Sequence, residues 1–189
     1  RRVLEAVYQS KGISKQGLAR QLSLSLPTVT QNLKELEALE LVTRQGHFDS
    51  TGGRKAQVYH FQADARLAIG VLLLKEGYHI VATDLYGTTL RSLTVPVSFS
   101  RDAGYLQQFG AQINRFAREL TDRPEQILGV AIAVQGLVSP DGSQIFYGVV
   151  NNCTGLTRED IQSYIDYPCC LIHDAEATAI GELWMQKDL

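Results

Sequence analysis

The side chains best suited to hydrogen-bond with another molecule recur at helical spacing between residues 26 and 36. Thr28, Gln31 and Lys34 are three residues apart, and a projection at about 100° per residue places them on one side of a helix. The opposite side is apolar and consists of Val29, Leu33 and Leu36. Hydroxyl, amide and ammonium groups reach base edges in the major groove, so we predict a recognition helix in which Thr28, Thr30, Gln31 and Lys34 contact DNA.

A second set of cations follows in a glycine-rich segment. Gly46 to Lys55 contains the adjacent glycines Gly52 and Gly53, followed directly by Arg54 and Lys55. Adjacent glycines let the backbone approach a surface closely, and the two cations suit contact with phosphate or with the minor groove. We therefore predict that Arg54 and Lys55 bind DNA from the tip of a loop.

Two polar pairs in the second part of the chain each follow an apolar run. Gln135-Gly136 come after residues 127–134, and His173-Asp174 come after residues 169–172. If both runs are strands of one sheet, the pairs lie at its carboxyl edge, where open α/β sheets bind ligands. Both residues also have purely structural explanations. Asp174 could be the N-cap of the following helix, which is the favoured interpretation of an isolated Asp at that position, and His173 could be a partly buried side chain whose hydrogen bonds are made within the protein.

Two short helices are predicted to position the first polar set. Ser14 is suited to cap a helix over Lys15 to Leu22, and residues 23–25 interrupt the chain. Ser25 is suited to cap the helix with the polar face. Pro27 falls inside the first turn of that helix, where a missing amide hydrogen costs nothing.

A hairpin is predicted to follow these helices. Strands over residues 41–45 and 58–61 flank the glycine-rich segment. An ordinary three-helix bundle with a solvated polar face would share the helix pattern, but it would not need this long basic loop. We therefore predict a winged helix-turn-helix, mainly α with a β wing, over residues 1–62.

The remainder, residues 63–189, predicts a mixed α/β layer. Three antiparallel strands are expected over residues 67–74, 79–85 and 89–97. An amphipathic helix over residues 105–120 follows, and residues 127–134 are apolar enough for a central strand. The last expected elements are a helix over 157–165, a strand over 169–172 and a helix from Asp174 through Trp184.

Charge separates the two parts. The chain has 189 residues, 44% of them hydrophobic, which is enough for one large domain or two modest ones. Residues 1–60 hold nine Lys and Arg against five Asp and Glu, a net charge of +4, whereas the remainder holds nine against fifteen, a net charge of −6. A basic part suits nucleic acid and an acidic part is repelled by phosphate, so the two parts should have different tasks.

The cysteines indicate a reduced, intracellular setting. Cys153, Cys169 and Cys170 are odd in number and lack zinc-ligand spacing, so we expect small buried hydrophobes. No apolar run approaches the roughly 20 residues needed to span a bilayer, and no signal peptide is visible. We therefore expect a cytoplasmic protein with no membrane contact. The chain starts at Arg1 rather than Met, which leaves open whether it is a fragment.

Together these residues resemble the ROK family of sugar-responsive repressors and sugar kinases, and specifically its winged-helix repressor branch. Ser50 to Lys55 is similar to the wing signature of those repressors. His173 to Glu182 is similar to the family segment of Asn-Asp followed by small residues and a later Glu. Asn152 to Leu156 stands where the family has a sugar-contacting Asn-x-x-Gly-aromatic loop, and Gly136 matches the glycine of the turn beneath the sugar.

The resemblance implies a fold and a binding site. It implies that this part of the chain is the first lobe of a two-lobed, ribonuclease-H-like fold, that of the actin-like ATPases, and that the second lobe is absent from it. The family's zinc-binding His and Cys cluster belongs to that second lobe, so no cofactor is expected in this chain. The sugar-binding residues it implies are Gly136, Asn152, His173 and Asp174.

The departures from the family pattern argue against an enzyme. ROK kinases have Asp-x-Gly-Gly-Thr in the first strand of this domain, where the Asp orients the metal and the backbone cradles ATP phosphate. The corresponding run here, Leu72 to Glu76, has neither the Asp nor the glycine pair. Leucine side chains cannot hold a phosphate, so no phosphoryl transfer is expected. His173 replaces the usual Asn and Gln135 also differs, which leaves the identity of the sugar open.

The sequence thus predicts a sequence-specific DNA-binding regulator, a repressor by resemblance, whose second part senses a sugar or sugar phosphate. One recognition helix reads only a few base pairs, so we expect a homodimer or tetramer on a double-stranded inverted-repeat operator. Two alternatives stay open: a ROK sugar kinase with an appended DNA-binding domain, and a regulator whose sensor domain serves only for dimerisation.

Overall fold

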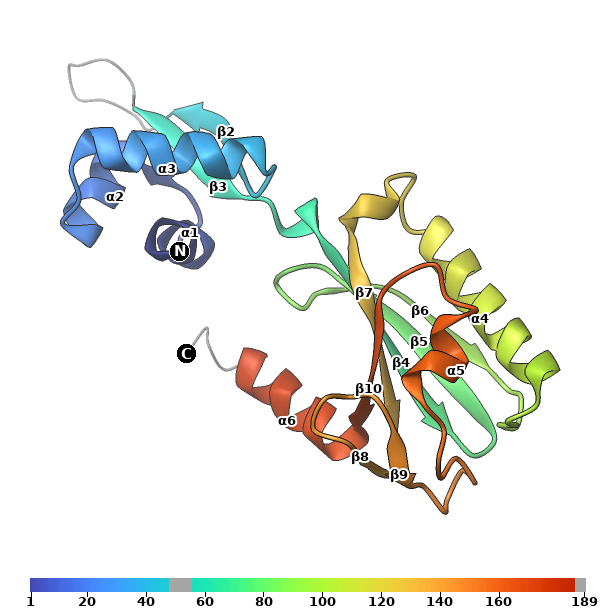
Figure 1. Cartoon of the computed structure of the whole chain (residues 1–189). Coiled ribbons are helices and arrows are strands. Elements are labelled where there is room, and N and C mark those ends of the chain that lie inside the picture. Colours follow the sequence, from blue (N-terminus) through green and yellow to red (C-terminus); the bar gives the residue numbers. More distant parts are fainter. Residues whose placement is uncertain (48–55, 186–189) are drawn as a thin grey trace. The chain divides into compact units, whose positions relative to one another are not determined.

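A computed structural model describes residues 1–47 and 56–185 of the chain (Figure 1). The chain divides into two compact units, Arg1–Ala65 and Arg66–Leu189. Each has a hydrophobic core of its own.

The first unit is a small helical domain with a three-stranded sheet in the order β1-β3-β2. Helix α1 and strand β1, which the sequence did not predict, complete it; α1 buries Val3, Ala6 and Val7 in the core with Leu18 and Leu33. The elements are α1 (Arg2–Gln9), β1 (Ile13–Ser14), α2 (Lys15–Leu22), α3 (Leu26–Ala38), β2 (Val42–His47), β3 (Gln57–Phe61) and the 3-10 turn η1 (Ala63–Ala65).

Side-chain caps fix where α2 and α3 begin, as predicted. Ser14 Oγ accepts a hydrogen bond from Gly17 N at 3.0 Å, and Ser25 Oγ accepts one from Thr28 N at 3.2 Å. Between the helices, Ser23 has the left-handed φ of 54°, which ends α2 and redirects the chain into α3. The helix-turn-helix therefore follows from three serines at the predicted places.

The second unit is an α/β layer around a five-stranded sheet in the order β10-β7-β4-β5-β6. Strands β4, β5 and β6 pair antiparallel, as predicted, and β7 pairs parallel with both β4 and β10. The elements are β4 (Leu67–Leu74), β5 (Gly77–Thr83), β6 (Thr89–Val95), α4 (Ala103–Arg118), the 3-10 turn η2 (Pro124–Gln126), β7 (Ile127–Val134), β8 (Leu137–Val138), β9 (Ile145–Tyr147), α5 (Arg158–Gln162), β10 (Cys169–His173) and α6 (Asp174–Met185).

Helix α4 covers one face of this sheet (Figure 1). Its apolar stripe is buried, as its four-residue spacing predicts. The residues of the stripe are Tyr105, Phe109, Ile113 and Phe116, and they pack on alternate residues of β4.

Three details differ from the sequence expectations. The short hairpin of β8 and β9 was not predicted, and α5 is shorter than the expected helix over residues 157–165. All three cysteines are free thiols, but only Cys153 and Cys169 are buried; Cys170 is exposed, so its prediction as a buried hydrophobe is wrong. Alternate residues of a strand face opposite sides, and Cys170 lies on the side away from the core.

Two helical glycines offer a matched test of the packing around α4. A Cβ added at Gly110 would lie 2.5 Å from Tyr164 Cβ, whereas one added at Gly181 in α6 would meet nothing within 4 Å. We expect Gly110→Ala to lower the free energy of unfolding by about 1–3 kcal/mol through overpacking, and Gly181→Ala to raise it by about 0.5–1 kcal/mol. Urea denaturation of both variants checks this, and equal effects would contradict the close approach.

Candidate functional site

The outer face of α3 carries the first predicted set of side chains. Thr28, Gln31 and Lys34 are exposed, whereas Val29 and Leu33 are fully buried. The predicted division of this helix into a polar and an apolar face is therefore confirmed. Thr30 is only partly exposed, so it lies at the margin of the polar face.

Hydrogen bonds organise this polar face. Thr28 Oγ1 lies 2.8 Å from Ser25 Oγ, and Gln31 Nε2 donates to Glu35 Oε1 at 2.9 Å. Glu35 is exposed on the same face, and the sequence reasoning missed it. The four-residue spacing from Gln31 was the signal that could have revealed this contact.

Arg44 braces the base of the β2–β3 pair against α3. Its Nη2 donates to Glu37 Oε2 at 2.6 Å, and its guanidinium carbon lies 5.8 Å from the centre of the Tyr59 ring. Lys15 Nζ approaches the same ring, also at 5.8 Å. The hydrogen bond to Glu37 raises the pKa of Arg44 above its usual value. The charge of Arg44 is thus paired within the domain. The predicted DNA contacts of Arg54 and Lys55 lie outside the described residues.

The second predicted site lies at the carboxyl edge of the sheet in the second unit. Strand register aligns Leu73 of β4 with Val134 of β7, and Val134 with His173 of β10. Gln135-Gly136 follow Val134 directly, and Asp174 follows His173. The structure therefore brings the two polar pairs to one edge, as their spacing from the apolar runs predicts.

A loop over residues 148–156 is fastened at this same edge. Asn151 Nδ2 donates to Leu73 O at 3.0 Å, across 78 positions of sequence. Arg101 Nη1 donates to Thr154 O at 2.8 Å, which ties the loop to the segment before α4. Asn152, the predicted sugar ligand, is exposed next to this anchor and has a left-handed φ of 51°.

The backbone around Gly136 leaves no room for a side chain. A Cβ there would lie 2.5 Å from Tyr147 O and 3.0 Å from the Cα of Gly148. The missing side chain thus lets the end of β9 and the start of the 148–156 loop approach the end of β7. Gly136 shapes the edge through this contact, and a direct role toward a sugar stays a prediction.

His173 and Asp174 lie side by side at the start of α6. His173 Nε2 is 3.4 Å from Asp174 Oδ1, and both side chains are about one third exposed. Asp174 is the first residue of the helix, and its Oδ1 accepts from the adjacent Ala175 N at 2.8 Å rather than from an amide further along the first turn. A carboxylate here is favoured by the helix dipole and remains partly open to a ligand.

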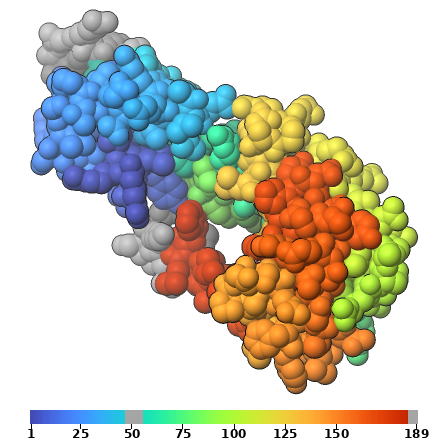
Figure 2. Space-filling model, in the orientation of Figure 1, coloured from blue at the N-terminus to red at the C-terminus, as the bar shows by residue number. Residues whose placement is uncertain are grey.

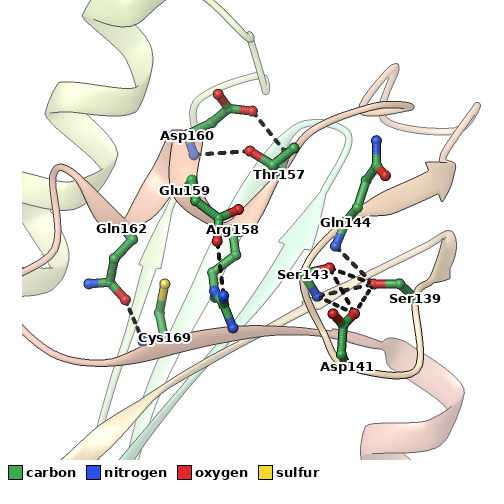
Figure 3. A network of polar contacts seen from close by, with 10 residues as sticks. All are labelled: Ser139, Asp141, Ser143, Gln144, Thr157, Arg158, Glu159, Asp160, Gln162 and Cys169. Atoms are coloured by element: carbon green, nitrogen blue, oxygen red, sulfur yellow. Dashed lines mark hydrogen bonds and ion pairs between the residues drawn. The ribbon is translucent and has the colours of Figure 1, made fainter.

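A polar network joins the β8–β9 hairpin, the start of α5 and strand β10 (Figure 3). Asp141 accepts hydrogen bonds from Ser139 Oγ and Ser143 Oγ at 2.6 and 2.7 Å, and Gly142 O accepts from Leu171 N of β10 at 3.1 Å. The hydrogen bonds from Ser139 and Ser143 lower the pKa of Asp141 to about 2. The hairpin and the loop after it lie at the surface, coloured orange in Figure 2.

Comparison with protein families matches both units. Residues 1–54 match the model of the MarR family, and residues 79–189 match the model of the ROK family. The chain belongs to the ROK family. Its first unit is a helix-turn-helix domain, and its second unit has the actin-like, sugar-kinase-like fold of ROK proteins.

Curated relatives include two xylose repressors. That of Caldicellulosiruptor bescii is 23% identical over 184 residues, covering 96% of this chain and 46% of the repressor. That of Bacillus subtilis is 23% identical over 180 residues, covering 95% and 47%. The chain of this ROK protein thus spans about half the length of the curated relatives it matches.

Solved structures support the fold. A ROK family transcriptional regulator, described as a homolog of the E. coli MLC protein, superposes with a TM-score of 0.71 at 20% identity over 98% of this chain and 48% of that one. A ROK family glucokinase from Streptomyces griseus gives 0.53 at 21% identity over 63% and 36%.

Two further observations concern the described residues only. In them, no helix is long and apolar enough to cross a membrane. Nor does that part of the chain gather three or more His, Cys, Asp or Glu side chains that could hold a metal ion.

The lowered pKa of Asp141 predicts a pH-dependent contribution to stability. The folded pKa of about 2 lies below the ordinary 3.8, so the contribution is fully present above about pH 4 and is lost as the pH falls through 2. We expect Asp141→Asn to destabilise the protein at neutral pH, with the difference from wild type shrinking between about pH 4 and pH 2. Urea denaturation across this range measures it. Asp122→Asn, an exposed carboxylate after α4, controls for loss of a surface charge, and a pH-independent difference for Asp141→Asn would contradict the network.

Proposed function

We propose that this ROK protein is a sequence-specific DNA-binding repressor that acts in the cytoplasm and is controlled by a sugar or sugar phosphate. One observation carries the proposal: a single chain joins a helix-turn-helix domain with an exposed polar face on α3 to a ROK unit whose polar groups gather at the carboxyl edge of its sheet. The relatives named xylose repressors support the same assignment.

In this proposal, α3 lies in the major groove. Thr28, Gln31 and Lys34 contact the DNA directly, with Thr30 at the margin. The hydrogen bond from Gln31 to Glu35 orients the amide before DNA is bound, and Glu35 offers an acceptor suited to the amino group of cytosine. The β2–β3 pair acts as a wing, from which Arg54 and Lys55 contact phosphate or the minor groove.

The effector site is assigned to the carboxyl edge. Asp174 accepts hydrogen bonds from sugar hydroxyls, and His173 and Asn152 complete the polar wall above the turn at Gly136. D-xylose is the first candidate because several relatives are named for it. The unit described here is one lobe of the sensor, and a second lobe, with the structural zinc of the family, supplies the opposite wall.

Catalysis is not part of the proposal. Leu72, at the position where ROK kinases carry the metal-orienting Asp, is 36% exposed and pairs with His79 of β5 and Ala133 of β7. A leucine neither holds a metal ion nor hydrogen-bonds a phosphate, so bound sugar is sensed but not phosphorylated. The likeness to a ROK glucokinase shows a shared fold, and a kinase remains the competing function to be tested.

Two substitutions on α3 test the DNA assignment. Against an operator selected from a random library, Gln31→Ala is expected to cost about 1–3 kcal/mol and to relax base preference without changing the salt dependence. Lys34→Ala removes a cation from the DNA-facing side of α3 and is expected to lower the slope of log affinity against log salt by about one. Gln107→Ala, an exposed glutamine of α4, is the control. Wild-type base preference and salt slope in both variants would refute the recognition helix.

A carboxylate substitution tests the effector site. Loss of a charge-assisted hydrogen bond costs about 1.5–3 kcal/mol, so Asp174→Ala should weaken sugar binding by about tenfold or more and leave operator affinity without sugar unchanged. Asp166→Ala is the matched control, because Asp166 lies before the amino end of β10 whereas Asp174 follows its carboxyl end. Calorimetric titration of the full-length protein with a panel of sugars and sugar phosphates measures both.

The same panel separates repressor, dimerisation module and kinase. Wild-type protein should bind one sugar without hydrolysing ATP in a coupled assay. Sugar-dependent ATP turnover would favour the kinase. If the protein binds none of the sugars, the dimerisation module is favoured. Sedimentation of the full-length protein, which we expect to be at least a dimer, then measures whether it dimerises.

A further inference from the structure

Asn151 is a buried amide whose nitrogen has a hydrogen-bond partner and whose oxygen has none among the described residues. Asn151 is only 4% exposed, and its Nδ2 donates to Leu73 O at 3.0 Å. Because Leu73 O is an acceptor, the amide nitrogen must face it, and Oδ1 therefore points away from Leu73 O. Within the described part of the chain, Oδ1 has no hydrogen-bond partner.

A second buried asparagine in the same unit shows what a purely structural amide looks like here. Asn114 of α4 is 8% exposed, and its Nδ2 donates to Tyr164 O at 3.0 Å. Its Oδ1 accepts from Asp166 N, also at 3.0 Å. Asn114 thus fastens a loop with both ends of the amide satisfied, as is usual for buried polar groups. Asn151 fastens a loop and leaves one end unpaired, which costs free energy that a structural role alone does not recover.

The position of Asn151 ties it to the edge of the sheet. Its partner Leu73 lies in the row that continues through Val134 to His173. The next residue, Asn152, is exposed and held in a left-handed conformation. Freeing the Asn151 amide would therefore release Asn152 from its place beside the proposed sugar site.

We infer that Asn151 is a positioning residue of the effector site: its amide holds the 148–156 loop on the end of β4, and this anchor keeps the exposed Asn152 in place to contact a polyhydroxy ligand. This inference rests on the proposed sugar site. It assigns the buried residue a role distinct from that of its exposed neighbour Asn152.

The test compares Asn151→Ala with Asn114→Ala in the full-length protein. Both substitutions remove a buried amide that fastens a loop, so both should lower the melting temperature. With D-xylose and D-glucose as calorimetric probes, we expect Asn151→Ala to weaken binding by about tenfold or more and Asn114→Ala to leave it within about twofold of wild type.

Asn151→Asp adds a readout that a loss of stability does not imitate. A protonated Asp places a hydroxyl donor at Leu73 O and keeps the carbonyl acceptor, whereas the ionised form removes the donor, and burial raises the pKa of such a carboxyl. Sugar affinity of Asn151→Asp relative to wild type should therefore recover as the pH falls from about 8 to about 5, while Asn151→Ala shows no recovery. His173 and Asp174 are present in every protein compared, so their titration cancels in this ratio.

The outcomes separate the inference from the function on which it rests. If wild type binds a probe and Asn151→Ala binds it as well as Asn114→Ala does, the positioning role is overturned and the sugar site stands. If the sugar affinity of Asn151→Asp does not recover at low pH, the positioning role is likewise overturned. If wild type binds neither sugar, the proposed effector site fails and the inference falls with it.

Discussion

The parallel pairing of β7 with both β4 and β10 is the constraint on which the ROK unit depends. Parallel register places the ends of these strands in one row, Leu73, Val134 and His173, so every segment that leaves a strand there starts from the same edge. The pairing is held by a core in which β4 and β7 bury alternate residues beneath α4. A one-residue slip of β10 would turn its buried residues outward and displace His173 and Asp174 from the row.

The sequence predicted those features of the fold that depend on residues close together in the chain. The capped starts of α2 and α3, the apolar stripe of α4 and the apolar run of β7 are local signals, and the structure confirms them. Helix α1 lacks a side-chain cap, and β8 and β9 have two and three residues, too few to show a period. Asn151 could not be singled out, because its hydrogen-bond partner, the carbonyl of Leu73, is 78 positions away in the sequence.

In the helix-turn-helix unit, pairing between charged groups limits what the net charge can predict. Its count of basic residues predicted the nucleic-acid partner, yet Arg44 is bound to Glu37 and stacked on Tyr59, and Glu35 adds an acid to the polar face of α3. Net charge therefore overstates the cations free to meet phosphate in this domain. Recognition in the proposed complex depends more on directed hydrogen bonds from α3 than on the charge of the unit.

Sensing and catalysis make different demands on one edge. A kinase gains only from contacts that strengthen in the transition state, whereas a sensor gains from any contact that differs between its DNA-competent and incompetent states. Leu72, which cannot hold a metal ion, is compatible with a sensor but not with a kinase. In the proposed sensor, Asp174 and its neighbours supply the hydrogen bonds to the hydroxyl groups of the ligand, and Leu72 supplies none. A coupling of about 1–3 kcal/mol, which a few such hydrogen bonds supply, changes operator affinity by about 5- to 150-fold. In the proposed regulator, a sequence without the phosphate-binding Asp and glycine pair is thus compatible with a stronger role in regulation, because binding energy does not have to be reserved for a reaction.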